Sequence, residues 1–168
     1  MYKNKINEFL HPSYLDASVM VKLFIDEKGH EIVRKFFNDN TWFYSTSFCF
    51  TEALSVLKVK YTYRNEINQK QYIFALRNLW NLATNNNIRV ENIDFSKQNS
   101  FSKCEEIIKR DNIDFIDAMQ IITIKNTFSL LKLGTDSEPL LITADSNLAK
   151  TAKYEGIRVW SCLEKEYK

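Results

Sequence analysis

The feature that most constrains the fold is a regular alternation of short apolar segments with longer amphipathic ones. Segments rich in β-branched and aromatic residues indicate strands at 13–16, 42–46, 88–93, 139–143 and 157–160. Between them, apolar residues recur at helical spacing. Strands that alternate with helices form a parallel sheet, because parallel strands need long crossover connections. We therefore predict an α/β protein, a three-layer α/β/α sandwich with a mostly parallel sheet.

The connecting segments are predicted to be helices at 17–26, 30–37, 47–63, 69–84, 96–110, 114–131 and 145–156. Gly156 ends the last of them, as a glycine C-cap does. The chain has 168 residues and shows no internal repeat and no linker rich in proline, glycine or serine. We therefore expect a single domain over 1–168, with 1–11 as an N-terminal extension.

The composition excludes several common classes of protein. Only three glycines are present and they stand well apart, so neither a GxGxxG dinucleotide fingerprint nor a phosphate-binding P-loop can form. The three cysteines are widely separated, which favours free thiols in a reducing compartment. No apolar run is long enough for a membrane span or a secretory signal, so we expect a cytoplasmic protein. The net charge of +2 neither requires nor excludes nucleic acid.

Four carboxylates stand where apolar residues would be expected. Asp16 stands at the carboxyl end of the first predicted strand, and Asp145 closely follows the fourth. Glu52 and Asp117 lie near the starts of two predicted helices, each on an otherwise mainly apolar face. The carboxyl ends of parallel strands meet at one edge of a sheet, where ligands of such folds bind. We therefore expect all four side chains to converge on that edge.

Helix capping is the competing interpretation of these acids. Asp16 and Asp145 are good N-cap residues, and an acid in a first helical turn gains about 0.3–1 kcal/mol from the helix dipole. Capping explains each acid taken singly, but it does not require four acids at the exits of strands. A shared site does require them, and carboxylates brought together resist ionisation unless a cation lies among them.

The types of donor narrow the choice of cation. Ligands that are all oxygen favour a hard divalent ion, Mg²⁺ or Mn²⁺. Zinc is disfavoured because His11 and His30 have no cysteine or histidine partners at ligand spacing. A carboxylate-held Mg²⁺ suits phosphoryl chemistry, in which it activates water and stabilises the leaving oxygen.

The order of the motifs resembles that of a known family. YLDASVMVKLF, then DEKGHE, STSFCFTEALSVL, DFIDAMQI and LLITADSNLAKTAKYEGIRVW, resembles the PIN-domain ribonucleases, and among them the VapC-type toxins of bacterial toxin–antitoxin pairs. The resemblance runs from Tyr14 to Trp160. Each motif is short and permissive, but their order and spacing together are specific.

This resemblance implies roles for individual residues. The family's metal-holding and catalytic acids correspond to Asp16, Glu52, Asp117 and Asp145. Ser18 and Thr143 match the hydroxyl residues that usually orient the acids or a metal-bound water. The family further implies a divalent-metal-dependent endoribonuclease, commonly a homodimer, with RNA as substrate and in many members an antitoxin protein as partner.

Three features depart from the family pattern. Residues 1–11 are an extension, and the segment 127–139 is longer than in compact toxins. Asp114, one turn before Asp117, adds an acid at the same edge. It can be a further ligand or a helix N-cap that supports the site, and we favour the cap.

Our sequence-based hypothesis is a Mg²⁺- or Mn²⁺-dependent endoribonuclease that cleaves RNA phosphodiester bonds with metal-activated water. Lys22, on the helix after Asp16, is a candidate for contact with a substrate phosphate. The segment KVKYTYR, at 58–64, interleaves basic and aromatic residues as RNA-binding surfaces do. A solvated helix face with packed tyrosines is the simpler interpretation of that segment.

Several other functions are alternatives to this hypothesis. A haloacid-dehalogenase-like phosphatase would need a second aspartate where Ser18 stands, and a receiver-like phosphoacceptor would need an acidic pair that is absent here. A PIN fold that only binds or assembles would be expected to lack part of the acidic set. A PIN protein that processes RNA without being a toxin is compatible with the same residues.

Overall fold

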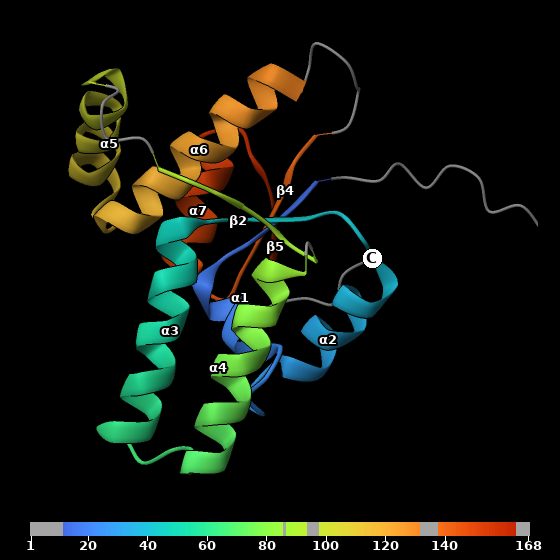
Figure 1. Ribbon diagram of the computed structural model, residues 1–168. Helices are drawn as coiled ribbons and strands as arrows, with labels where there is room; N and C mark the ends of the chain where they lie inside the picture. Colours follow the sequence, from blue (N-terminus) through green and yellow to red (C-terminus); the bar gives the residue numbers. More distant parts are fainter. Residues whose placement is uncertain (1–11, 86, 94–97, 132–137, 164–168) are drawn as a thin grey trace, which may run out of the picture.

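The protein forms a sandwich in which helices cover both faces of a five-stranded sheet (Figure 1). The computed structural model describes residues 12–85, 87–93, 98–131 and 138–163, so the predicted extension 1–11 and part of 127–139 lie outside them. The strands are β1 (Ser13–Leu15), β2 (Phe43–Thr46), β3 (Arg89–Glu91), β4 (Leu140–Thr143) and β5 (Arg158–Ser161). They lie in the order β3-β2-β1-β4-β5, and every neighbouring pair is parallel. The predicted α/β/α sandwich is therefore confirmed.

The helices divide between the two faces of the sheet. The hydrophobic core on one face joins it to α1 (Ala17–Lys22), α2 (His30–Asp39), α3 (Ser47–Thr62) and α4 (Gln69–Thr84). The core on the other face joins it to α5 (Gln98–Asp111), α6 (Phe115–Leu131) and α7 (Ser146–Tyr154). Helices α3 and α4 lie side by side as an antiparallel pair that extends beyond the sheet (Figure 1).

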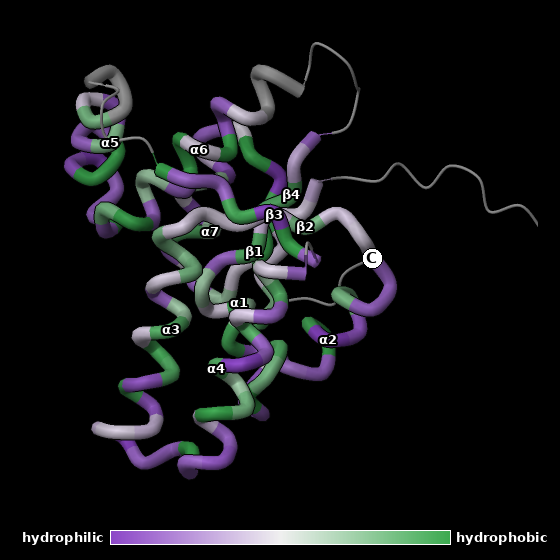
Figure 2. The backbone as a smooth tube through the Cα atoms, in the orientation of Figure 1, coloured by the Kyte–Doolittle hydropathy of each residue, from purple (hydrophilic) through white to green (hydrophobic). Residues whose placement is uncertain are grey.

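Both cores follow from the alternation of side chains along the strands. Tyr14 and Leu141 point into the core beneath α5–α7, whereas Leu15 and Ile142 point into the core beneath α1–α4. A parallel sheet covered on both faces needs such continuously apolar strands. Figure 2 shows the hydrophobic residues gathered at the central strands, whereas the turn that joins α3 to α4 is mainly hydrophilic.

Several predicted elements are shorter than the sequence indicated, and α1 and β3 show why. Helix α1 ends at Lys22 rather than residue 26, because the turn that follows buries Ile25 and lets Glu27 pair with Lys22. The edge strand β3 has only three residues, as edge strands often do.

The predicted end of the last helix is confirmed. Gly156 has a φ of 79°, its N–H donates to Lys153 O over 3.0 Å, and the N–H of Ile157 donates to Ala152 O over 2.9 Å. This pair of bonds is a Schellman motif, which needs a residue that tolerates the left-handed conformation. The motif closes α7 and turns the chain directly into β5.

Free cysteines and the absence of a membrane-spanning segment are both expected from the composition. Cys49, Cys104 and Cys162 are buried free thiols, as predicted. Within the described ranges, no helix combines the length and apolarity needed to cross a bilayer.

Candidate active site

The candidate site lies where the connections of the sheet change direction. The chain leaves β1 through α1 on one face and leaves β4 through α7 on the other, although β1 and β4 are neighbours. In open α/β sheets, ligands bind where the connections diverge in this way, outside the carboxyl ends of the strands. Asp16 follows β1 at this point, and Asp145 follows β4.

Asp16 is held by a dense set of hydrogen bonds. It is only 5% exposed, and its Oδ1 accepts a bond from the Ala17 N–H over 2.7 Å. Its Oδ2 accepts bonds from the hydroxyls of Ser18, over 2.6 Å, and Thr143, over 2.9 Å. Burial raises the pKa of Asp16 above its ordinary value of 3.8, and these hydrogen bonds offset part of that effect.

The two hydroxyls also connect Asp16 to the loop that carries Asp145. The Asp145 N–H donates to Thr143 Oγ1 over 2.9 Å, and the Ala144 N–H donates to Ser18 Oγ over 3.1 Å. Each hydroxyl therefore accepts from the β4–α7 loop and donates to Asp16. The position of Asp16 is thereby fixed relative to Asp145, in the manner expected of groups that orient a ligand carboxylate.

Capping accounts for part of the acidic set. Asp145 Oδ1 accepts bonds from the N–H groups of Asn147, over 2.7 Å, and Leu148, over 2.9 Å, and caps α7. Asp114 Oδ1 accepts a bond from the Asp117 N–H over 2.9 Å, which is the cap bond that we favoured. Asp145 and Asp114 are both exposed.

Capping does not account for Glu52 and Asp117. Neither carboxylate has a hydrogen bond or an ion pair with the described residues, although both are partly buried. Burial raises the pKa of Glu52 to about 7, with further contributions from the charges of Asp16, Asp114 and Asp145. Burial raises the pKa of Asp117 to about 8, with contributions from Asp114, Asp16, Asp145 and Glu52. The acids therefore share one electrostatic environment.

The donor chemistry of this edge fits a hard divalent cation. The side chains offer carboxylate oxygens, and the charges that raise the pKa of Glu52 and Asp117 are all carboxylates. No three acidic, histidine or cysteine side chains among the described residues stand close enough to form a finished metal cage. Mutual repulsion favours such spacing in the absence of a cation. The residues that could hold a cation here are Asp16, Glu52, Asp117 and Asp145.

The structure does not leave Lys22 available for a phosphate. Its side chain is 7% exposed, and its ammonium pairs with Glu27. Lys60 pairs with the same carboxylate, over 2.8 Å, and with Glu66, over 2.6 Å. A buried and paired ammonium would have to break its ion pair to contact RNA, so we do not retain Lys22 as a substrate contact.

Part of the segment 58–64 follows the simpler of its two interpretations, although Tyr63 is 72% exposed. The ring of Tyr61 stacks on that of Tyr72 from α4, with a centroid distance of 4.9 Å and an interplanar angle of 12°. Lys60 belongs to the ion pairs just described, and Arg64 lies 3.6 Å from Glu66. Tyr61, Lys60 and Arg64 in this segment therefore mainly make contacts within the protein.

Sequence reasoning missed two buried residues beside the acids. Thr46, at the end of β2, is fully buried and caps α3 by accepting a bond from the Cys49 N–H over 3.1 Å. Burial, followed by the charges of Asp16, Glu52 and Asp117, raises the pKa of the Cys49 thiol. Cys49 therefore stays a neutral thiol next to the acids. Its position three residues before Glu52, on the same side of α3, is the signal that could have found it.

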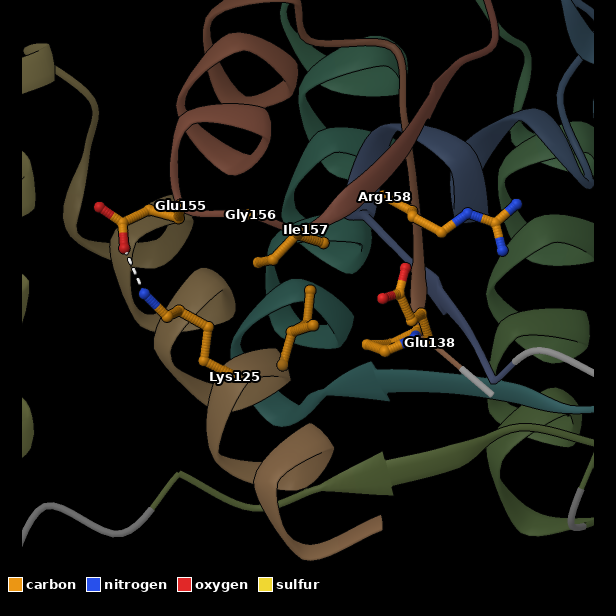
Figure 3. Close-up of a pocket in the computed structure, with 8 residues that line it drawn as sticks. Lys125, Glu138, Glu155, Gly156, Ile157 and Arg158 are labelled. Carbon is orange, nitrogen blue, oxygen red and sulfur yellow. Dashed lines mark hydrogen bonds and ion pairs between the residues drawn. The ribbon is translucent and has the colours of Figure 1, made fainter. Parts of the chain in front are cut away.

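A charged pocket lies at the opposite edge of the sheet. It has a volume of about 200 Å³ and includes Glu155, Lys125 and Arg158 in its lining (Figure 3). Glu155 Oε2 accepts from the Lys125 ammonium over 2.5 Å, and Glu155 Oε1 accepts from Arg110 over 2.7 Å. Although burial alone would raise the pKa of Glu155, these two hydrogen bonds hold it below its ordinary value. The negative charge of Glu155 is therefore already balanced by Lys125 and Arg110.

Comparisons with solved structures support the fold. The chain is similar to PAE2754 from Pyrobaculum aerophilum, at 15% identity and a TM-score of 0.59, over 89% of this chain and 90% of that one. It is also similar to VapC20 from Mycobacterium tuberculosis, described as a sarcin–ricin loop cleaving toxin, at 11% identity and a TM-score of 0.54, over 68% of this chain and 82% of that one. Identities this low show the shared fold alone. A comparison with curated protein sequences gives no match.

A family model gives a more direct assignment. The model of the PIN domain matches residues 13–161, which span β1 to β5 and include all of the acids described above. PIN domains are generally metal-dependent ribonuclease folds. The match covers most of the chain, and it agrees with the strand order and with the acids at the carboxyl edge. The protein belongs to the PIN domain family.

Proposed function

We propose that the protein is a divalent-metal-dependent endoribonuclease and the toxin of a toxin–antitoxin pair. The observation that carries the proposal is the set of carboxylates at the carboxyl edge of the sheet, of which Glu52 and Asp117 have no cationic partner in the described structure. Such a set is costly unless a cation is bound. The likeness to VapC20, described as a sarcin–ricin loop cleaving toxin, supports the choice of RNA as substrate.

The chain's own residues would act by holding a cation and orienting its ligands. Asp16, Glu52, Asp117 and Asp145 would supply the oxygen ligands, and Mg²⁺ or Mn²⁺, when bound, supplies an activated water and neutralises charge on the phosphate. Ser18 and Thr143 hold Asp16 in one orientation. Glu52 and Asp117 have pKa values of about 7 and 8, so both would give up protons as the cation binds.

Cleavage of a labelled RNA by the full chain tests the enzyme. We expect cleavage with Mg²⁺ or Mn²⁺, no cleavage with EDTA, and a loss of at least about a hundredfold in Asp16→Asn. Glu155→Gln is the matched control, because it removes a carboxylate from the opposite edge. Equal cleavage by wild type and Asp16→Asn at the same metal concentration would refute the assignment.

Expression in a bacterial host tests the toxin role separately. We expect wild-type expression to arrest growth, Asp16→Asn to relieve the arrest, and the product of a small neighbouring gene to act as the antitoxin. An active nuclease that leaves growth unchanged would instead support a PIN protein of RNA processing. We also propose that the active form is a homodimer, which the mass of the purified protein in solution tests.

A further inference from the structure

Three phenylalanine rings from three different helices form a continuous ladder, here called the phenylalanine ladder. The rings of Phe48, on α3, and Phe115, on α6, lie 6.0 Å apart between centroids at an interplanar angle of 47°. The rings of Phe115 and Phe101, on α5, lie 6.5 Å apart at 44°. Phe48 and Phe115 are partly buried, whereas Phe101 is 61% exposed. The ladder therefore leads from the interior to a ring that faces solvent.

The ladder begins among the acids of the candidate site. Phe48 stands one helical turn before Glu52 on α3, so the two residues share a side of that helix. Phe115 lies in α6 between Asp114 and Asp117. Helix α5 lies on the outer side of α6, near the start of α3 (Figure 1). The ladder thus runs outward from the carboxyl edge of the sheet and ends at Phe101.

The packing of α5 does not depend on Phe101. Cys104, fully buried, and Ile107, 5% exposed, already anchor the inner side of α5 in the core. Phe101 lies one turn before Cys104 and extends the same apolar stripe past the part that is covered. A single exposed ring is common on protein surfaces. What distinguishes Phe101 is its contact with a second ring that adjoins the acids.

Two lysines of α1 and α3 are already ion-paired and would have to be released before they could hold an RNA strand. Lys22 and Lys60 are both ion-paired with Glu27, and the carboxyl edge itself repels phosphates unless a cation is bound. Binding energy for a strand can instead come from its bases. Stacking of one base on an aromatic side chain contributes about 1–3 kcal/mol and tolerates any base, because every base has a π-face.

We infer that Phe101, supported by Phe115, is a specificity-determining residue that stacks on an unpaired base next to the scissile phosphate. The inference rests on the proposed nuclease function and names a residue that would position its substrate. A base inside a duplex is already stacked on its neighbours, so the ladder selects RNA that is single-stranded or looped at the cleavage site.

The test uses full-length protein and a short single-stranded RNA that carries 2-aminopurine, whose fluorescence falls when it stacks. Binding is measured in the Asp16→Asn background with Mg²⁺, and the Michaelis constant is measured in the otherwise wild-type protein. Phe101→Leu keeps apolar bulk without a π-face, Phe101→Trp keeps the π-face, and Phe74→Leu is the matched control. Phe74 is 57% exposed on α4, away from the acids.

We expect Phe101→Leu to raise the dissociation constant and the Michaelis constant by about 5- to 150-fold and to abolish the fluorescence quench. Phe101→Trp should stay within about threefold of the parent, and Phe74→Leu should equal it. The effect of Phe101→Leu should be confined to single-stranded RNA and absent for the same sequence as a duplex.

Three results would overturn the inference. First, Phe101→Leu could bind and cleave RNA like the parent. Second, Phe74→Leu could weaken RNA binding as much as Phe101→Leu does. Third, Phe101→Trp could lose as much RNA binding as Phe101→Leu while melting at the parental temperature. The last result would assign Phe101 to packing. If the wild type cleaves no RNA with any divalent cation, the nuclease proposal fails instead, and the 2-aminopurine quench still reports on stacking at Phe101.

Discussion

Carboxylates at the two edges of the sheet have opposite electrostatic surroundings. At the amino edge, Glu155 accepts a hydrogen bond from Lys125 (Figure 3) and another from Arg110, and its pKa is held below its ordinary value. At the carboxyl edge, Glu52 and Asp117 have no such partners in the described structure, and their pKa values rise to about 7 and 8. The chain therefore pairs Glu155 with two cations and leaves Glu52 and Asp117 without any among the described residues.

This difference helps to separate structural acids from functional ones. Glu27, which pairs with Lys22 and Lys60, also has a lowered pKa although burial opposes it. A partly buried carboxylate without a partner reduces stability, and several together reduce it further. A fold that can pair Glu27 and Glu155 but keeps Glu52 and Asp117 apart from cations fits a site whose cation comes from solution. This is why we place the chemistry at the carboxyl edge and not in the pocket of Figure 3.

The largest expected contrast between the edges is in RNA cleavage. Glu52→Gln and Asp117→Asn should each lower kcat/KM by at least about a hundredfold, because each would remove a charged ligand of the proposed metal ion. Glu155→Gln should change it by less than about twofold. The rates are measured with a labelled RNA at one saturating Mg²⁺ concentration. If Glu155→Gln lost as much activity as Asp117→Asn, the two edges would not differ in function.

The next contrast is in the effect of metal on stability. Mg²⁺ at 100 times its dissociation constant should raise the free energy of unfolding of the wild type by about 2.7 kcal/mol, because it binds only the folded protein. Glu155→Gln should gain the same amount. Asp117→Asn should gain much less at the same Mg²⁺ concentration, and EDTA should remove every gain. Thermal melts with and without Mg²⁺ measure these differences, and an equal gain in all three proteins would place the cation elsewhere.

The sequence predicted the elements of the fold because their signals are local. Alternating apolar segments, the cap residues Asp16 and Asp145 and the closing Gly156 each act within a few residues of their own position. The early end of α1 was not predictable in this way. It depends on the burial of Ile25 and on the ion pair between Lys22 and Glu27, which form only once the helices are packed.

The same distinction between local signals and tertiary contacts applies to the residues of the candidate site. Residues that follow parallel strands must lie at one edge, so topology alone placed Asp16 and Asp145 together. Whether Lys22 can contact a phosphate depends on its tertiary ion pair with Glu27, which its position in the sequence does not indicate. The phenylalanine ladder joins three helices, and no local pattern links Phe48 to Phe101. Contacts between distant segments are what the pattern of one sequence leaves open.

A smaller contrast is expected in the dependence of stability on pH without metal. Asp117 has an ordinary pKa of 3.8 and a folded pKa of about 8, so the folded protein binds its proton more tightly than the unfolded chain does. Its cost is absent below about pH 4, grows as pH rises, and is complete above about pH 8. The metal-free wild type should therefore lose stability over this range.

Asp117→Asn should remove part of that loss. Because Asp117 is partly exposed, solvent reduces the effect, and we expect the variant to be about 1–2 kcal/mol more stable than wild type at pH 8 and equal to it at pH 4. Chemical denaturation in EDTA at both pH values measures the difference. A variant less stable than wild type at pH 8 would mean that Asp117 makes favourable contacts that outweigh the repulsion.

The smallest effect is expected for Glu155→Gln, with the opposite sign. The pKa of Glu155 is lowered in the folded protein, so its contribution to stability is present above its ordinary value of 4.5 and is lost as pH falls through the folded pKa. Its partners Lys125 and Arg110 are partly exposed, with side-chain exposures of 46% and 38%. We therefore expect a loss of only about 0.5–1 kcal/mol at pH 8, reduced further by salt. Denaturation in EDTA at low and high salt measures it. At pH 8 the two variants should thus depart from the wild type in opposite directions, and a shift in the same direction would contradict the contrast between the two edges.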